Sequence, residues 1–241
     1  MPEESAPSFR DDVTVELVKH SAADTDVLFA ARVSTLGEQS LDEVRKDPER
    51  SKGLLNYLMR DRHGSPFEHN SMTFFISAPI FVFREFHRHR VWSYNEESGR
   101  YRELRPVFYV PGRSRKLVQE GKPGRYVFLD GTDAQHKLVT EVMEASYRRS
   151  YAAYQEMLEA GIAREVARSV LPVGLFSTMY ATCNARALMH FLSLRTKSEA
   201  ATVPSFPQRE IEMVAEKMEA IWAELMPLTH AAFVANGRVA P

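Results

Sequence analysis

The first half of the chain shows both common periods of apolar residues. Residues 13–18 alternate apolar and polar side chains, a period of two that predicts a strand. Residues 24–33 suit a helix, with Asp24 as a candidate cap. Residues 41–60 also have a helical pattern, which we expect to break at Pro48 into two shorter helices because proline interrupts helical hydrogen bonding.

The middle of the chain is less regular. Residues 71–86 are rich in β-branched and aromatic side chains, which predict a strand followed, after Pro79, by a second segment that is either extended or helical. Residues 111–135 contain repeated glycines and prolines, which favour a loop region with a candidate short strand at 126–129.

Helical patterns dominate the second half. Residues 136–160 predict a long helix that ends at Gly161, and a short helix follows over 162–171. Two further helices are expected over 178–194 and 208–225.

These elements predict an α+β fold, with a mixed or antiparallel sheet flanked by helices and a helix-rich C-terminal half. No internal repeat or interdomain linker is evident in the sequence. We therefore expect a single domain over residues 12–241, preceded by a loose N-terminal tail over residues 1–11.

Composition narrows the class of protein. The 241 residues are 44% hydrophobic, which is enough for a sizeable core. A net charge of −1 and a pI of about 6.7 argue against a general binder of nucleic acids or membrane surfaces, because such proteins carry a broad basic excess.

The number of cysteines and the first residues of the chain indicate the cellular compartment. The single cysteine, Cys183, excludes a disulfide within the chain and fits a reducing environment. The acidic start lacks the basic and apolar regions of a signal peptide, and no apolar run approaches the ~18–20 residues that span a bilayer. We expect a cytoplasmic protein with no membrane association.

One segment concentrates the candidate chemistry. Residues 88–101 read RHRVWSYNEESGRY, a composition that neither a helix nor a strand requires. The wider window 84–105 holds six arginines and four glutamates, a local excess of two positive charges in a nearly neutral chain. Because guanidinium groups bind phosphate and carboxylate oxygens two at a time, this segment predicts a bound anionic ligand.

Other uses of the same residues have to be weighed. A nucleic-acid-binding module would use the arginines but should show a broader basic surface. A metal-dependent hydrolase would use the histidines His63, His69, His87 and His89, yet no HExxH motif or cysteine ligand accompanies them, so we expect no metal.

Two side chains are candidate nucleophiles by type. Cys183 lies among apolar neighbours, and a free cysteine most often packs as a small buried apolar residue. Ser98 has no obvious base near it in the sequence, so contact with a phosphate or a base is the favoured interpretation. Glu97 is expected to point away from Glu96 and is left outside the candidate site.

A second candidate region lies over residues 184–195. If this region is helical, Asn184 and Arg195 fall within roughly 20° of one another, while Arg186 and His190 lie on a nearly opposite side. Apolar residues between them indicate burial. Contact with two ligands, or with a ligand and a neighbouring subunit, explains polar groups on two sides.

Three blocks together resemble the flavin-dependent thymidylate synthases. Residues 88–101 fill every fixed position of that family's RHRxxSxNExSxRY signature. The block from Glu165 to Arg168, continuing to Arg195, is similar to the family's carboxy-terminal site region, and residues 62–69 are similar to its flavin-contacting loop. The resemblance covers roughly residues 25 to 225.

The resemblance implies two groups of binding residues. Those expected at FAD are Ser65, Arg88, His89, Arg90, Glu96, Asn184, Ala185, Arg186 and His190, with Ser34, His63 and Glu68 as further candidates. Those expected at dUMP are Glu85, Phe86, His87, Arg88, Glu96, Ser98, Gly99, Arg100, Arg168 and Arg195. Arg195 matches the family's catalytic arginine, which polarises the uracil ring.

The implied reaction is the reductive methylation of dUMP to dTMP. Methylenetetrahydrofolate would supply the carbon and leave as tetrahydrofolate, and FAD reduced by NADPH would supply the reducing equivalents. The resemblance also implies a homotetramer with sites shared between subunits, and no specific nucleic-acid partner.

Three positions depart from the family pattern. Residues 200–207 carry two prolines and interrupt the helix expected after Arg195, which indicates a local insertion. Glu199 stands where the family has a histidine, and His190 stands where an asparagine is common. The loop over 111–135 is long and is a candidate for shaping access of the folate.

Overall fold

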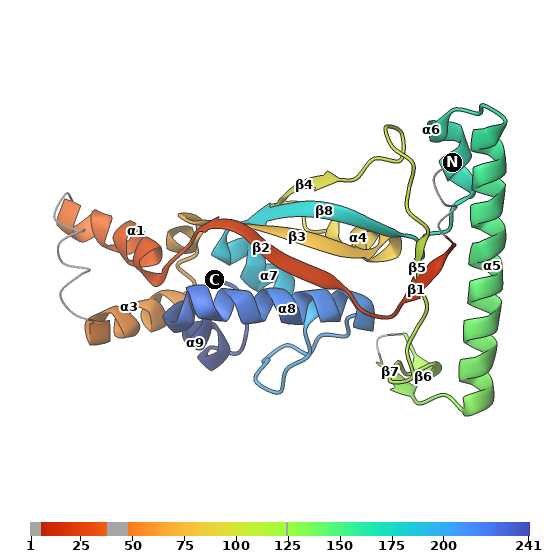
Figure 1. The fold of residues 1–241 in the computed structure, drawn as a ribbon. Helices are drawn as coiled ribbons and strands as arrows, with labels where there is room; N and C mark the ends of the chain where they lie inside the picture. The colour runs from red at the N-terminus through yellow and green to blue at the C-terminus, as the bar shows by residue number, and fades with distance from the viewer. Residues whose placement is uncertain (1–5, 38–47, 124) are drawn as a thin grey trace. The chain divides into compact units, whose positions relative to one another are not determined.

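The computed structural model describes residues 6–37, 48–123 and 125–241 (Figure 1). These residues form two units. Among the described residues, unit 1 comprises residues 6–13, 77–85, 96–123 and 125–179, and unit 2 comprises residues 14–37, 48–76, 86–95 and 180–241. The single domain expected over residues 12–241 stays a prediction.

Unit 1 combines short strands with one long helix. Strand β1 (Ser8–Arg10) pairs in parallel with β5 (Val107–Tyr109), and β6 (Val118–Lys122) pairs antiparallel with β7 (Arg125–Leu129). Its helices are α5 (Asp133–Glu159), α6 (Arg164–Ala167) and the 3-10 turn η3 (Arg168–Val170). Helix α4 (Ile80–Phe86) also belongs to this unit, except for its last residue.

Aromatic side chains of α5 build the core of unit 1. The rings of Tyr147 and Phe108 stack with centroids 4.8 Å apart. Two further tyrosines hold the backbone of Leu104, because its amide donates to the Tyr154 hydroxyl at 3.3 Å and its carbonyl accepts from the Tyr151 hydroxyl at 3.4 Å. The long helix therefore anchors the chain just after the arginine-rich signature.

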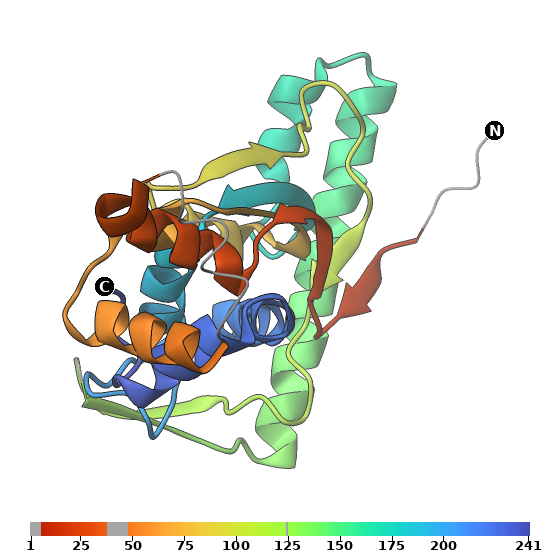
Figure 2. The same cartoon turned by 90° about the vertical axis from the view of Figure 1, so that its left-hand side faces the viewer.

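Unit 2 holds most of the remaining helices. They are α1 (Asp24–Leu36), α3 (Pro48–Arg60), the 3-10 turn η2 (Ser65–Glu68), α7 (Ala185–Arg195), α8 (Arg209–Leu225) and α9 (Pro227–Ala235). Helix α3 packs against α9, and α8 against strand β2, an arrangement that Figure 2 shows from the α1 and α3 side. The helix-rich C-terminal half is confirmed.

A four-stranded sheet has the order β2-β3-β8-β4. Its strands are β2 (Thr14–Ser21), β3 (Ser71–Pro79), β8 (Phe176–Cys183) and β4 (Ser93–Glu96). Within unit 2 the Thr73 and Thr182 hydroxyls of neighbouring strands lie 2.9 Å apart. The α+β class is confirmed, with one parallel and one antiparallel pairing in unit 1.

Several sequence predictions are confirmed. Strand β2, helix α5 and helix α8 lie where they were expected, and α3 begins at Pro48, which suits the first turn of a helix because proline has no amide hydrogen to donate. The segment after Pro79 is helical, as α4. The part of the predicted helix over residues 41–47 lies outside the described residues.

The helix predicted over residues 178–194 is confirmed from Ala185 onward and is wrong over residues 178–184. Residues 176–183 form strand β8, and α7 begins only at Ala185, with Asn184 as its N-cap. In β8 the side chains of Met179, Ala181 and Cys183 are buried while Tyr180 is half exposed, a period of two that is typical of a strand.

Two further predictions need correction. Residues 8–10, expected in a loose tail, form β1, where the Ser8 amide donates to the carbonyl of Pro106 at 2.8 Å. The region 111–135 contains the antiparallel pair β6–β7, and not one short strand alone. Gly121, near the end of β6, adopts a φ of +98°, a conformation that favours glycine. None of the described helices is both long and apolar enough to cross a bilayer.

Asp24 is the first residue of α1, but its carboxylate caps helix α9. Its carboxylate accepts from the amides of Leu228 and Thr229 at 2.9 and 2.8 Å, and from the Thr229 hydroxyl at 2.6 Å, all in the first turn of α9. The cap expected for α1 is instead supplied by Asp26, which accepts from the amide of Ala23 at 2.8 Å.

We predict that Asp24→Ala lowers the free energy of unfolding by about 1–2 kcal/mol, because two amides at the start of α9 lose their acceptor. Urea unfolding followed by circular dichroism measures the change. The matched control is Asp130→Ala, an exposed aspartate outside any helix. Equal losses in the two variants would contradict the capping role.

Candidate functional site

The turn over residues 98–101 lies in unit 1. The carbonyl of Ser98 accepts from the amide of Tyr101 at 3.1 Å, and the Ser98 hydroxyl accepts from the amide of Arg100 at 3.3 Å. These bonds fix the backbone at the centre of the signature. Ser98, Gly99 and Arg100 are therefore held as one rigid turn.

Gly99 allows a second arginine to approach this turn. A Cβ atom at Gly99 would lie 2.8 Å from Cδ1 of Leu104 and 3.2 Å from Cδ of Arg168. Any larger residue would have to displace one of these side chains. The structure thus brings Arg168, from η3, against the turn that carries Arg100, as the resemblance implied.

Arg100 is paired with a carboxylate from α6. Its Nε atom lies 3.0 Å from Oε2 of Glu165, and both side chains are more than half exposed. An exposed pair of this kind contributes little to stability because water screens it. An incoming phosphate can therefore compete for Arg100 at small cost.

Glu97 was missed by the sequence prediction. Its side chain is only 10% exposed, its Oε2 accepts from the Thr178 hydroxyl at 3.3 Å, and its Oε1 lies 3.1 Å from Nε of Arg102. The amide of Glu97 also donates to the carbonyl of Thr178 at 2.8 Å. Glu97 thus fastens the signature to strand β8, a role for which the sequence carries no local signal.

The other acidic candidates in unit 1 are less enclosed. Glu96 ends β4 with an exposed side chain, and Glu85 is half-buried near the end of α4. Phe86, the last residue of α4, and the residues that follow it lie in unit 2. The Phe86 ring is fully buried, whereas His87, Arg88 and Arg90 are exposed.

His89 and Arg195 meet within unit 2. The Nε–H group of Arg195, the last residue of α7, donates to Nε2 of His89 at 3.2 Å. The imidazole ring of His89 packs edge-on against Phe191, with centroids 4.9 Å apart. Tyr94 fixes the turn that carries His89, because its hydroxyl lies 2.9 Å from the carbonyl oxygens of both Phe86 and His89.

Burial, and then the positive charge of Arg195, lower the pKa of His89 from 6.5 to about 4. His89 is therefore neutral at physiological pH. Because Nε2 accepts the bond from Arg195, the ring proton lies on Nδ1. The neutral ring orients this N–H group of the guanidinium without adding negative charge of its own, which suits a group that must stabilise negative charge.

The side chain of Arg186 is held at the start of α7. Its Nη1 atom lies 2.5 Å from Oε1 of Glu68, and its Nε–H donates to the main-chain oxygen of Pro241 at 2.7 Å. A Cβ atom at Gly64 would come within 2.5 Å of this guanidinium, so a larger residue there would displace the guanidinium from its present position. Ser65 follows Gly64 and is exposed.

The first turn of α7 is capped by two asparagines. Oδ1 of Asn184 accepts from the amide of Ala187 at 2.9 Å, and Oδ1 of Asn70 accepts from the amide of Ala185 at 2.7 Å. Asn184 therefore has a structural role besides the flavin contact implied by the resemblance. Burial, and then the charge of Arg186, lower the pKa of His190.

Three further candidates, Ser34, His63 and Cys183, also lie in unit 2 and take part in none of the contacts described above. The hydroxyl of Ser34 donates to the carbonyl of Ala31 at 3.1 Å, and the ring of His63 lies 5.4 Å from that of Tyr57. Cys183 is buried, and burial raises the pKa of its thiol, which disfavours a thiolate. No group of three potential metal ligands occurs among the described residues.

Comparison with known proteins gives consistent results. Residues 16–228 match the family model described as thymidylate synthase complementing protein. The flavin-dependent thymidylate synthase of Streptomyces avermitilis is 83% identical over 236 residues, which cover 98% of this chain and 96% of the relative. That of Streptomyces coelicolor is 79% identical over 233 residues, covering 96% and 95%.

A solved structure has the same fold. The UMP/dUMP methylase PolB from Streptomyces cacaoi, crystallised with 5-Br dUMP, superposes with a TM-score of 0.93 at 58% identity, covering 97% of this chain and all of PolB. The fold and the match to the family model are those of the Thy1 class of enzymes. The chain belongs to the flavin-dependent thymidylate synthase family and is an enzyme of that family.

The lowered pKa of His89 makes stability depend on pH. Between about pH 4 and pH 6.5 the unfolded chain binds a proton at this position that the folded chain does not, so the free energy of unfolding falls as the pH falls through this range. We predict that His89→Gln, which keeps a neutral acceptor, loses less stability than the wild type over this range.

Urea unfolding at about pH 7 and about pH 4.5 measures this difference. His20→Gln, which replaces an exposed histidine on β2, is the matched control and should retain the wild-type dependence. Identical pH dependence in His89→Gln and the wild type would show that His89 is not held neutral.

Proposed function

We propose that this protein methylates dUMP to dTMP. Methylenetetrahydrofolate supplies the carbon and leaves as tetrahydrofolate, and NADPH supplies the reducing equivalents through FAD. The family membership supports the reaction class, and PolB, described as a UMP/dUMP methylase, supports a uridylate substrate. The observation that carries the proposal is the guanidinium of Arg195 oriented by neutral His89.

Arg195 has the electrostatic setting that this reaction needs. The methylene carbon is an electrophile, so C5 of uracil must first become nucleophilic, which places negative charge on the ring as an enolate, and a positioned cation stabilises that charge. A carboxylate partner would cancel part of the cation's charge, whereas the His89 ring orients the guanidinium without doing so. We assign Arg195 as the catalytic residue for this reason.

The turn of unit 1 supplies donors suited to the nucleotide phosphate. Arg100 and Arg168 present guanidinium groups, and Ser98 presents a hydroxyl beside the close approach at Gly99. We assign Ser98, Gly99, Arg100 and Arg168 to dUMP. Glu85, Phe86, His87, Arg88 and Glu96 complete the proposed dUMP set, and Arg195 acts on the base.

The donors of unit 2 fit a flavin dinucleotide. Arg186 is held within a cradle that a Cβ at Gly64 would fill, and exposed Arg88 and Arg90 offer charge for a pyrophosphate. We assign Ser65, Arg88, His89, Arg90, Glu96, Asn184, Ala185, Arg186 and His190 to FAD. When bound, FAD would carry reducing equivalents from NADPH to the new methyl group.

Three further features belong to the same proposal. We propose a cytoplasmic homotetramer in which subunits share sites, which would explain why α7 carries polar groups on two sides of one helix. We also propose that the region 111–135, here a hairpin, borders the folate. The loop 200–207 departs from the family pattern and is assigned no ligand.

The direct test is a flavin spectrum followed by an assay. Protein incubated with FAD and desalted should retain a visible flavin band, and anaerobic NADPH should bleach it at a rate that dUMP alters. Formation of dTMP then tests methyl transfer, with UMP as a parallel substrate because of the PolB relationship. A folded sample that retains no flavin would refute the proposal.

We predict that Arg195→Ala retains FAD but lowers the rate of dTMP formation by roughly 10²–10³-fold, because one positioned charge is lost. Arg60→Ala, which replaces an exposed arginine paired with Asp61, is the control and should keep wild-type turnover. Wild-type turnover in Arg195→Ala would remove Arg195 from the catalytic role.

We predict that Ser98→Ala raises the KM for dUMP by about tenfold while retaining most of kcat, because one contact to the nucleotide is lost. Steady-state kinetics at varied dUMP separate the two constants, and Ser146→Ala, which replaces an exposed serine on α5, serves as the control. Loss of all turnover at saturating dUMP would instead identify Ser98 as a nucleophile.

A further inference from the structure

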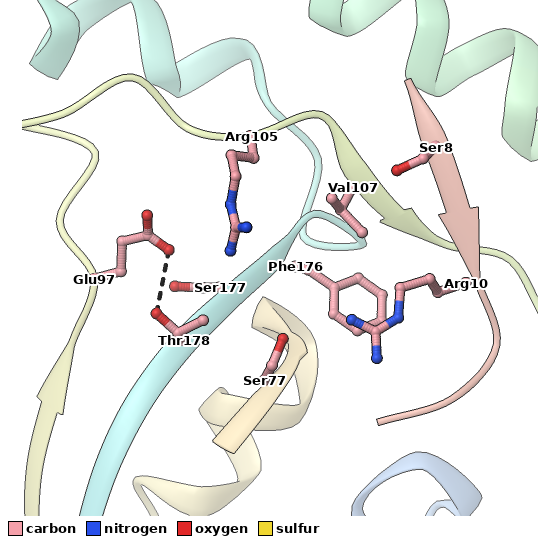
Figure 3. A pocket seen from close by; sticks show the side chains of 9 residues that line it. All are labelled: Ser8, Arg10, Ser77, Glu97, Arg105, Val107, Phe176, Ser177 and Thr178. Carbon is pink, nitrogen blue, oxygen red and sulfur yellow. Dashed lines mark hydrogen bonds between the residues drawn. The ribbon is translucent and has the colours of Figure 1, made fainter. Parts of the chain in front are cut away.

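A small cavity lies within unit 1, and none of the residues that line it is assigned to either ligand (Figure 3). Its volume is about 130 Å³, below the roughly 300 Å³ at which pockets for drug-sized ligands begin. Four separate stretches of unit 1 form its wall: β1, the end of β3, the segment 97–107 and the start of β8. Its size suits a single small ion or functional group.

Two arginines line the cavity from opposite sides. Figure 3 shows Arg105 directed toward β8 near Ser177, and Arg10 reaching in from β1. The guanidinium of Arg10 lies 4.8 Å from the centroid of the Phe176 ring, a cation–π contact that holds it in place. Arg10 also pairs with Asp12 at 2.8 Å, but Asp12 is 60% exposed, so water screens this pair.

Hydroxyl groups occupy much of the wall between the arginines. Ser77, Ser177 and Thr178 come from neighbouring strands, and Ser177 is only 3% exposed. Buried hydroxyl groups need hydrogen-bond partners. Arginine forks and serine hydroxyls together form a donor set that matches the oxygens of a small anion.

One carboxylate, that of Glu97, also lines the cavity. Its Oε1 lies 3.1 Å from Nε of Arg102 without a hydrogen bond, and its Oε2 accepts from Thr178. Glu97 is thus paired with Arg102, as Arg10 is with Asp12, and each pair has one partner that is more than half exposed. With these two pairs counted as neutral, Arg105 leaves the cavity with a positive balance.

We propose that this cavity is a binding site for a small oxyanion of the size of inorganic phosphate. Arg105 and Arg10 would hold the charge, and Ser177 would donate a hydrogen bond. The site is distinct from the proposed nucleotide turn, although Glu97 and Arg105 lie at the two ends of the segment that contains Ser98, Gly99 and Arg100. An anion bound in the cavity would therefore restrain the turn over residues 98–101.

The test is equilibrium binding of inorganic phosphate by calorimetry in chloride buffer at constant ionic strength. It is done with and without saturating dUMP, because phosphate would also enter a nucleotide site. We expect one saturable phosphate per chain to remain in the presence of dUMP. Arg105→Gln should weaken its binding by about tenfold or more, since a charged hydrogen-bonding partner is lost.

Two matched variants sharpen the result. Arg113→Gln removes an arginine of the same unit that is 69% exposed and pairs with Asp133, and it should bind phosphate as the wild type does. Arg105→Lys keeps the charge but loses the fork, so its affinity should fall between those of the wild type and Arg105→Gln. Thermal unfolding confirms that each variant is folded.

Three outcomes would overturn the proposal: no saturable phosphate binding, displacement of all bound phosphate by dUMP, or equal affinity in Arg105→Gln and the wild type. None of these results bears on methyl transfer. Conversely, a protein that forms no dTMP but binds phosphate through Arg105 would refute the proposed reaction and leave the cavity assignment intact.

Discussion

The fixed position of helix α7 is the constraint on which the arrangement of unit 2 depends. Its first turn is held by Asn184 and Asn70, and Phe191 stacks on Phe86 with ring centroids 4.6 Å apart. At its end, Arg238 donates to the Thr196 hydroxyl at 2.8 Å. Because both ends and the middle are anchored, Arg195 and the turn after α4 hold one geometry.

The anchor at the end of α7 is itself electrostatic. Arg238 is 7% exposed and binds Glu219 through two bonds of 2.6 and 2.7 Å. Burial alone would raise the pKa of Glu219, but hydrogen bonds from His230 and Arg238 outweigh it and lower the pKa to about 2. The carboxylate therefore stays ionised, and the cost of burying Arg238 is offset locally.

The signature 88–101 identified the family because the ligand determines which residue types occur there and at what spacing. Both the residue types and the spacing can be read directly from the sequence. The helix wrongly predicted over 178–184 shows the limit of local pattern. Asn184 has the same side chain whether it lies within a helix or caps one, so only tertiary packing reveals that β8 ends there. The role of Glu97 likewise depends on Thr178, 81 residues away.

The net charge of a sequence segment differs from the positive charge that is available to bind a ligand. The excess of arginine over residues 84–105 indicated an anion site, yet Arg100 and Arg102 each have a carboxylate partner. Arg195 lies outside that window and has a neutral histidine as its hydrogen-bond acceptor. A carboxylate acceptor offsets the charge of a guanidinium and a neutral acceptor does not, so the partner of each arginine bears on its chemistry. Arg100 is suited to exchange its exposed carboxylate partner for another anion, whereas the bond from Arg195 to neutral His89 is suited to orienting a cation toward charge that forms only during reaction.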